Sequence, residues 1–210
     1  MIKKLTPLLG TVGPVLFTIS FTTNGLLRSD YDPKHNYVSE LSIGPHGWIQ
    51  IVSFMFLGLC LLGFAAGIFK TIQDGKASRA GPILLSIIAL CYFVSGPLVT
   101  DPSAMFDNQQ SLQGFLHGIF GALVFALSPV CAFVYWLRFR IDPKWKHLQN
   151  WTLIAVIMML ATVVLMKIAQ PQASPLNMWA GIIQRCSLLS FYAWVFTFAL
   201  GLKAERADEG

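Results

Sequence analysis

The sequence predicts an all-α membrane protein, a bundle of six transmembrane helices with a short amphipathic helix in the first outer loop. Hydrophobic residues make up 55% of the 210 residues and charged residues only 12%, whereas a soluble domain has about 25% charged residues. The apolar residues also fall in continuous runs without the alternation of a transmembrane β-strand. We therefore expect residues 1–210 to form a single transmembrane domain.

Six apolar stretches are long enough to cross a hydrocarbon layer about 30 Å thick, which takes roughly 20 helical residues. They cover residues 5–27, 48–70, 80–100, 112–137, 149–168 and 178–202. The first stretch follows two lysines, as in a signal peptide, but it is long and no A-x-A-like cleavage site follows it. We expect it to be a retained first helix.

Basic residues predict the orientation, because they gather on the cytoplasmic side of membrane proteins. With the N-terminus inside, all but four of the 15 basic residues fall on the inner side. The four on the outer side are Arg28, Lys34, Lys167 and Arg185. We expect a multi-pass protein of the cytoplasmic (inner) membrane with both termini in the cytoplasm. The net charge of +5 then reflects contact with anionic lipids, not nucleic-acid binding.

The first outer loop contains DYDPKHNYVSELSIGPHGW, residues 30–48, which concentrates acids, histidines and serines in an otherwise apolar chain. Asp32 before Pro33 is typical of a helix start and Gly44 of a helix stop, which predicts a short helix over about 33–43. The polar side chains that would share one face of this helix are Asp32, His35, Ser39 and Ser42. The alternative is a solvated loop that only caps the next helix.

Further polar residues fall on the same outer side. Pro97 can kink the third span, and Asp101 lies just past its outer end. The fourth span begins QSLQGFLHGIFG, which places Gln113 and His117 on nearly one face. His117 is the only histidine within a predicted span, and packing is its simplest role.

Arg185 lies about two turns inside the outer boundary of the sixth span. An arginine there costs about 2.5–3.5 kcal/mol on insertion scales, so it must be paired, hydrated or extended to the interface. The candidate acidic partners are Glu40, Asp101, Asp32, Asp30 and Asp107, with Glu40 and Asp101 preferred. The alternative is an ion pair that only fixes the sixth helix against the loop. Lys167 is interpreted as an interfacial anchor.

Three classes of function remain open. In the preferred one, an outward-facing polar pocket binds or handles a lipid-like amphiphile, with Arg185 holding a phosphate or carboxylate. The second is an intramembrane hydrolase or transferase with Ser39, His117 and Asp101 as candidate catalytic residues. The third is a structural or assembly protein with no ligand. Whether the protein is an enzyme stays open.

The predicted ligand-binding residues are Arg185, His117, Glu40, Ser39, Asp101, His35 and Gln113. No HExxH or comparable ligand spacing occurs, and a haem would need paired axial ligands, so we expect no metal and no cofactor. Membrane lipids are the expected partners and nucleic acid is not. A homo-oligomer or a membrane protein partner stays open.

Four motifs in order carry a resemblance to a known family. NYVSELSIGPHGW, FVSGPLVTDP, LHGIFGAL and IIQRCSLL resemble the successive signatures of the DUF998 family, which are six-helix bacterial membrane proteins of unknown function. The resemblance covers nearly the whole chain and implies a fold and a membrane location, but no reaction. The serine–acid pair of the first outer loop and the histidine early in the fourth span are also similar to the Frag1/DRAM/Sfk1 membrane proteins, which are linked to lipid handling.

Overall fold

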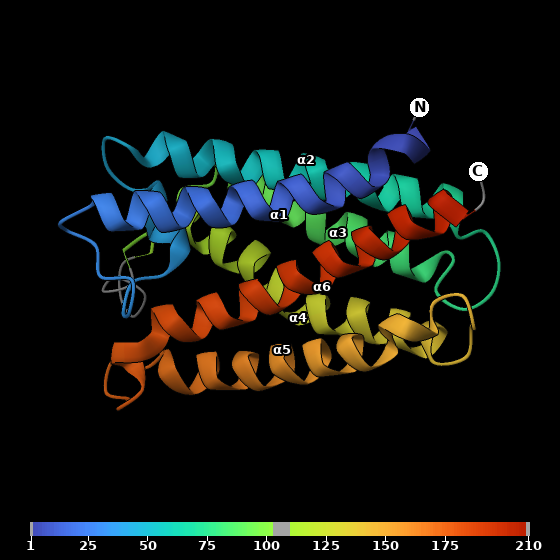
Figure 1. The fold of residues 1–210 in the computed structure, drawn as a ribbon. Helices are drawn as coiled ribbons and strands as arrows, with labels where there is room; N and C mark the ends of the chain where they lie inside the picture. The colour runs from blue at the N-terminus through green and yellow to red at the C-terminus, as the bar shows by residue number, and fades with distance from the viewer. Residues whose placement is uncertain (1, 103–109, 209–210) are drawn as a thin grey trace.

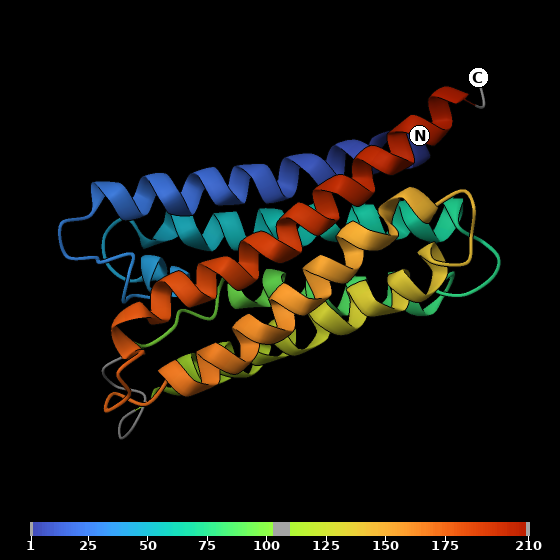
Figure 2. The same ribbon diagram turned by 60° about the horizontal axis from the view of Figure 1, so that its bottom comes forward.

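Each long helix packs against the next one along the chain, and the last closes back onto the first (Figures 1 and 2). The computed structural model describes residues 2–102 and 110–208 and shows no strand in that part of the chain. The long helices are α1 (Ile2–Leu27), α2 (Gly47–Thr71), α3 (Ala80–Ser95), α4 (Leu112–Phe139), α5 (Gln149–Ala169) and α6 (Ala180–Asp208). The connections contain the short 3₁₀ helices η1 (Val38–Ser42), η3 (Lys146–Leu148) and η4 (Asn177–Trp179).

Five of the described helices are long and apolar enough to cross a membrane: α1, α2, α4, α5 and α6. The sixth, α3, is apolar but has only 16 residues, which corresponds to about 24 Å of rise. The helix therefore ends five residues before the end of the span expected over 80–100. The helix stops at Ser95 because Pro97 has no backbone N–H to continue the hydrogen-bond ladder.

The two ends of the bundle differ in what they contain. The η1 end, on the left of Figure 1, holds the connections 28–46 and 170–179 and the start of α4. The terminal end, on the right, holds the start of α1, the end of α6 and the connections 72–79 and 140–148. All the polar residues predicted to form a site lie toward the η1 end, apart from Asp107, which lies outside the described residues.

Aromatic side chains fill the interior of the ring. Near the middle, Phe17 packs against Phe54 and Tyr192, with ring centroids 5.1 and 5.7 Å apart, and the Tyr192 hydroxyl bonds to the Tyr92 hydroxyl at 3.1 Å. A second cluster around Phe198 fills the terminal half. Because aromatic pairs bury large apolar areas, this core stabilises the ring.

Candidate functional site

The polar loop of residues 28–46 is folded by its own side chains and is not an α-helix. The Asp32 carboxylate accepts from the Lys34 amide at 3.0 Å, and the Asn36 side-chain oxygen accepts from the Asp32 amide at 2.9 Å. One turn follows, and then η1 begins at Val38. The predicted short helix over 33–43 is therefore present only over Val38–Ser42 and as a 3₁₀ helix. Its first half is not helical because short polar side chains compete for the backbone groups that a helix would use.

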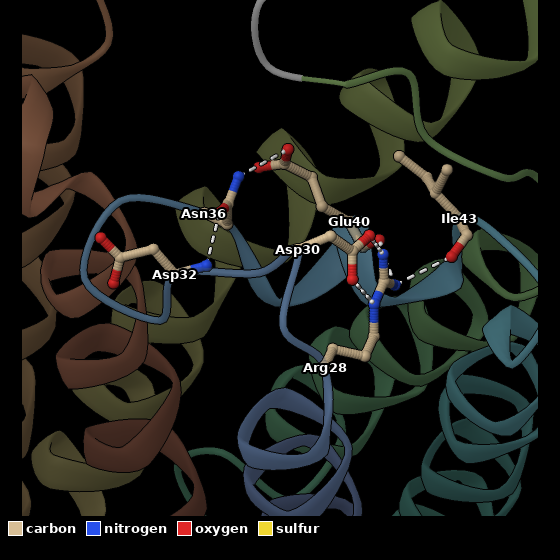
Figure 3. Close-up of polar contacts among 6 residues, drawn as sticks. All are labelled: Arg28, Asp30, Asp32, Asn36, Glu40 and Ile43. Atoms are coloured by element: carbon tan, nitrogen blue, oxygen red, sulfur yellow. Dashed lines mark hydrogen bonds and ion pairs between the residues drawn. The ribbon is translucent and has the colours of Figure 1, made fainter.

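Glu40 and Arg28 hold the rest of this loop (Figure 3). The Glu40 carboxylate accepts from the Tyr37 amide at 2.8 Å and from the Asn36 side chain at 3.1 Å. The Arg28 guanidinium donates to both oxygens of Asp30, at 3.1 and 2.6 Å, and to the Ile43 carbonyl at 2.8 Å. This fork lowers the pKa of Asp30 and raises that of Arg28, chiefly through the side-chain hydrogen bonds between them.

Arg185 does not have the acidic partner that the sequence predicts. Its Nη1 donates to the carbonyls of Pro33 at 2.8 Å, Asn36 at 3.0 Å and Gly181 at 2.9 Å, and its Nη2 donates to the Tyr31 hydroxyl. No ion pair joins Arg185 to an acid among the described residues. Four oxygens with partial negative charge therefore compensate the half-buried cation in place of one carboxylate.

Residues around Arg185 that the sequence did not single out hold the loop against α6. The Val38 amide donates to the Gln184 side chain at 2.7 Å, and the loop backbone lies so close to Gly181 that a Cβ there would collide with three loop carbonyls. The Tyr31 phenol donates to the Tyr37 carbonyl at 3.0 Å. Burial raises the pKa of Tyr31, and the nearby Arg185 opposes that rise. In the sequence, the only indication of this close approach between the loop and α6 is the glycine of the motif GIIQRC.

A cavity of about 380 Å³ lies beside this loop, between η1, α4, α5 and α6. Its walls are largely apolar, and Phe54 and Tyr92 close it on the side of the core. Two glycines of α4, Gly118 and Gly121, border it, and a Cβ added to either would meet no atom within 4 Å. Ligand pockets of about 300–1,000 Å³ are typical of proteins that bind small molecules.

His117 contributes to the cavity wall and also closes the end of α3. Its Nδ1 lies 2.6 Å from the Leu98 carbonyl and 3.1 Å from the Ser95 carbonyl. Because carbonyl oxygens only accept, Nδ1 carries the hydrogen, and Nε2 of the neutral ring is an acceptor. His117 therefore satisfies carbonyls that the short α3 leaves without helical partners.

The other predicted residues are spread over the η1 end. Ser39 borders the cavity, but Arg185, Glu40, Asp101, His35 and Gln113 do not. Ser111 caps the start of α4, because its hydroxyl accepts from the Gly114 amide at 3.0 Å. The Asp101 carboxylate holds this cap by accepting from the amide and hydroxyl of Ser111 at 2.7 and 2.9 Å. His35 bonds through Nε2 to Asn177 in η4 at 3.0 Å. Gln113 is exposed.

This arrangement does not form a catalytic triad. A catalytic histidine must be oriented by a third group and reach the nucleophile. His117 is oriented by two carbonyls, Asp101 is occupied by Ser111, and no hydrogen bond in the described parts joins His117 to Ser39. Within residues 2–102 and 110–208, no three metal-ligating side chains come together.

The apolar helices and their ring arrangement define the class: this is a multi-pass α-helical integral membrane protein. Comparison with known families then gives a narrower assignment. Residues 11–201 match DUF998, whose description is "Protein of unknown function", and the chain belongs to that family. No curated protein and no solved structure matches it.

Proposed function

We propose that the protein crosses the cytoplasmic membrane six times with its η1 end outside. The connections at the terminal end carry Lys76, Arg79, Arg140, Lys144 and Lys146. Such an excess of basic residues is typical of the cytoplasmic side, which agrees with cytoplasmic termini. α3 would cross with the help of the irregular segment that follows it, which is tolerated at membrane depth when protein surrounds it.

The function we propose is to bind or handle a lipid-like amphiphile in the cavity beside η1. The observation that carries this proposal is a cavity of about 380 Å³ with apolar walls inside the bundle and a polar rim that includes Ser39, His117 and Gln184. An amphiphile needs both surfaces, because its chain avoids water and its head must keep hydrogen-bond partners. Arg185 supports the site by binding Pro33 and Asn36 in the loop just before η1, which forms one wall.

Filling the cavity tests this function. Gly121→Leu adds a side chain where a Cβ meets no neighbour, so it should occupy the cavity without disturbing the helices. Ala161→Leu adds similar bulk at an exposed position of α5 outside the cavity and is the matched control. Native mass spectra of protein gently extracted from the membrane should show a bound amphiphile on the wild type and on Ala161→Leu.

The Gly121→Leu protein should lose that adduct while keeping its thermal stability. An adduct that stays on Gly121→Leu would place the ligand elsewhere. Spectra without any adduct for all three proteins would leave the structural role, with Arg185 holding the loop, as the better account.

A further inference from the structure

The charged side chains that line the cavity are all of one sign. Lys167, near the end of α5, is the only side chain with a fixed positive charge among the described residues that line it, and none of these residues is acidic. Its Nζ lies 3.5 Å from the side-chain oxygen of Gln170, and no described acid forms an ion pair with it. A cation without a counter-ion at the rim of an apolar space favours a negatively charged ligand head.

The cavity also opens toward the side of the bundle. Gly118, Ala122 and Ala126 border it, are exposed, and follow one another at four-residue spacing along α4. Lys167 and Gln170, across from them on α5, are exposed too. The lining therefore reaches the lipid-facing surface along the seam between α4 and α5, at the η1 half of both helices. Figure 2 shows these two helices side by side.

The size of the cavity suits the apolar part of an amphiphile. Its volume of about 380 Å³ lies within the range of about 300–1,000 Å³ that is typical of small-molecule pockets. The cavity therefore has room for an alkyl chain.

We infer that the ligand is an anionic amphiphile with an alkyl chain in the cavity, whose carboxylate or phosphate head is held by Lys167 and which enters between α4 and α5. This inference rests on the proposed function and names its substrate class. It changes the expected role of two residues. Lys167 becomes the ligand's counter-ion in place of Arg185, whose Nη1 and Nη2 already donate to the loop and to α6.

The test uses probes that share one dodecyl chain and differ in the head: dodecanoate, dodecyl phosphate, dodecanol and dodecyltrimethylammonium. Each is added at the same concentration to the protein in nanodiscs of zwitterionic phosphatidylcholine. The readout is the rise in Tm, which reports binding to the folded state. The rise measured for Gly121→Leu gives the non-specific effect of each probe on the bilayer and is subtracted.

We expect the two anionic probes to stabilise the wild type most and the cationic probe least. Lys167→Gln should weaken the apparent affinity for both anions by about tenfold and leave dodecanol unchanged, while Lys167→Arg keeps the preference. Lys34→Gln removes an exposed cation at the same end, outside the cavity, and should behave as the wild type. The ratio of dodecanoate to dodecyl phosphate affinities tells whether a fatty acid or a lysophospholipid head is preferred.

Two failures are distinguishable. If all four heads stabilise the wild type equally and Lys167→Gln has no effect, the charge assignment is wrong although the cavity still binds a chain. If no probe stabilises the wild type more than Gly121→Leu, the proposed function fails together with the inference.

Discussion

The α1–α2 pair and the α4–α5 pair use glycine in opposite ways. A Cβ at Gly13 of α1 would lie 2.6 Å from the Cβ of Cys60 in α2, and one at Gly67 of α2 would collide with Thr6. A Cβ at Gly118 or Gly121 of α4 would meet nothing within 4 Å. In the first pair, missing side chains let two helices touch. In the second, they leave space unfilled, so the cavity originates in the residues of α4.

The largest expected effect tests directly whether the glycines of the two helix pairs differ. Gly13→Leu should lower the free energy of unfolding by more than about 3 kcal/mol, because the new side chain has no room between α1 and α2. Gly121→Leu makes the same chemical change and should alter stability by less than about 1 kcal/mol. Folded yield and Tm measured by fluorescence-detected size-exclusion chromatography compare the two. Equal losses would mean that the space beside α4 closes in the membrane.

The second effect concerns the wall of the cavity. Arg185→Met should cost about 3 kcal/mol, because hydrogen bonds to a half-buried charge are lost and the carbonyls of Pro33 and Asn36 are left without their donor. Hydrogen exchange should rise across residues 31–43 and stay unchanged in α1 and α2. Arg28→Met is the control and should cost less, since its partner Asp30 is 70% exposed. Exchange that rises equally in both variants would contradict a special role for α6.

A third effect is a loss of stability at high pH that depends on Tyr31. The folded protein raises the pKa of this phenol above its ordinary value of about 10. The folded state therefore keeps the proton longer than the unfolded chain, so the stabilisation is complete below pH of about 10 and is lost as pH rises through the folded pKa. The difference in Tm between the wild type and Tyr31→Phe should shrink over that range. A difference independent of pH would mean that the phenol does not titrate with unfolding.

The smallest effect compares the same helix pairs by adding a single methyl group to one glycine of each. Gly121→Ala should stabilise the protein by up to about 1 kcal/mol, since alanine is the better helix former and its Cβ meets open space. Gly10→Ala, whose Cβ would lie 2.7 Å from that of Ala199, should destabilise it. Urea or thermal unfolding in one detergent gives both signs. Two changes of the same sign would show that helix propensity outweighs packing at these positions.

The long helices could be predicted from the sequence because continuous apolar runs are a direct consequence of helix length and bilayer thickness. The loop could not. Asp32, Pro33 and Gly44 match the signals of a short helix, but the side chains of Asp32 and Asn36 bind loop amides, which helix signals do not anticipate. α3 ends five residues before the expected span does, at the position that Pro97 indicates.

The site was predicted only in outline, for a related reason. Arg185 was expected to find a carboxylate, yet its partners are a phenol and backbone carbonyls, which every residue has and which therefore leave no pattern in a sequence. Of the ligand-binding candidates, His117 and Ser39 border the cavity. The cavity itself depends on which glycines face open space, and helical spacing alone does not separate Gly121 from Gly13.

The shortness of α3 also bears on the bilayer around the protein. At about 24 Å of rise, α3 is shorter than the hydrocarbon thickness of about 30 Å, while its neighbours α2 and α4 have 25 and 28 residues. In the proposed arrangement of six spans, the irregular segment after α3 completes the crossing, and the bilayer beside α3 is expected to be thinner than beside α2 and α4. Head groups and water would reach deeper on that side. The hydrophobic length of the protein would then differ around its circumference. A change in the acyl-chain length of the host bilayer would affect α3 before the other helices.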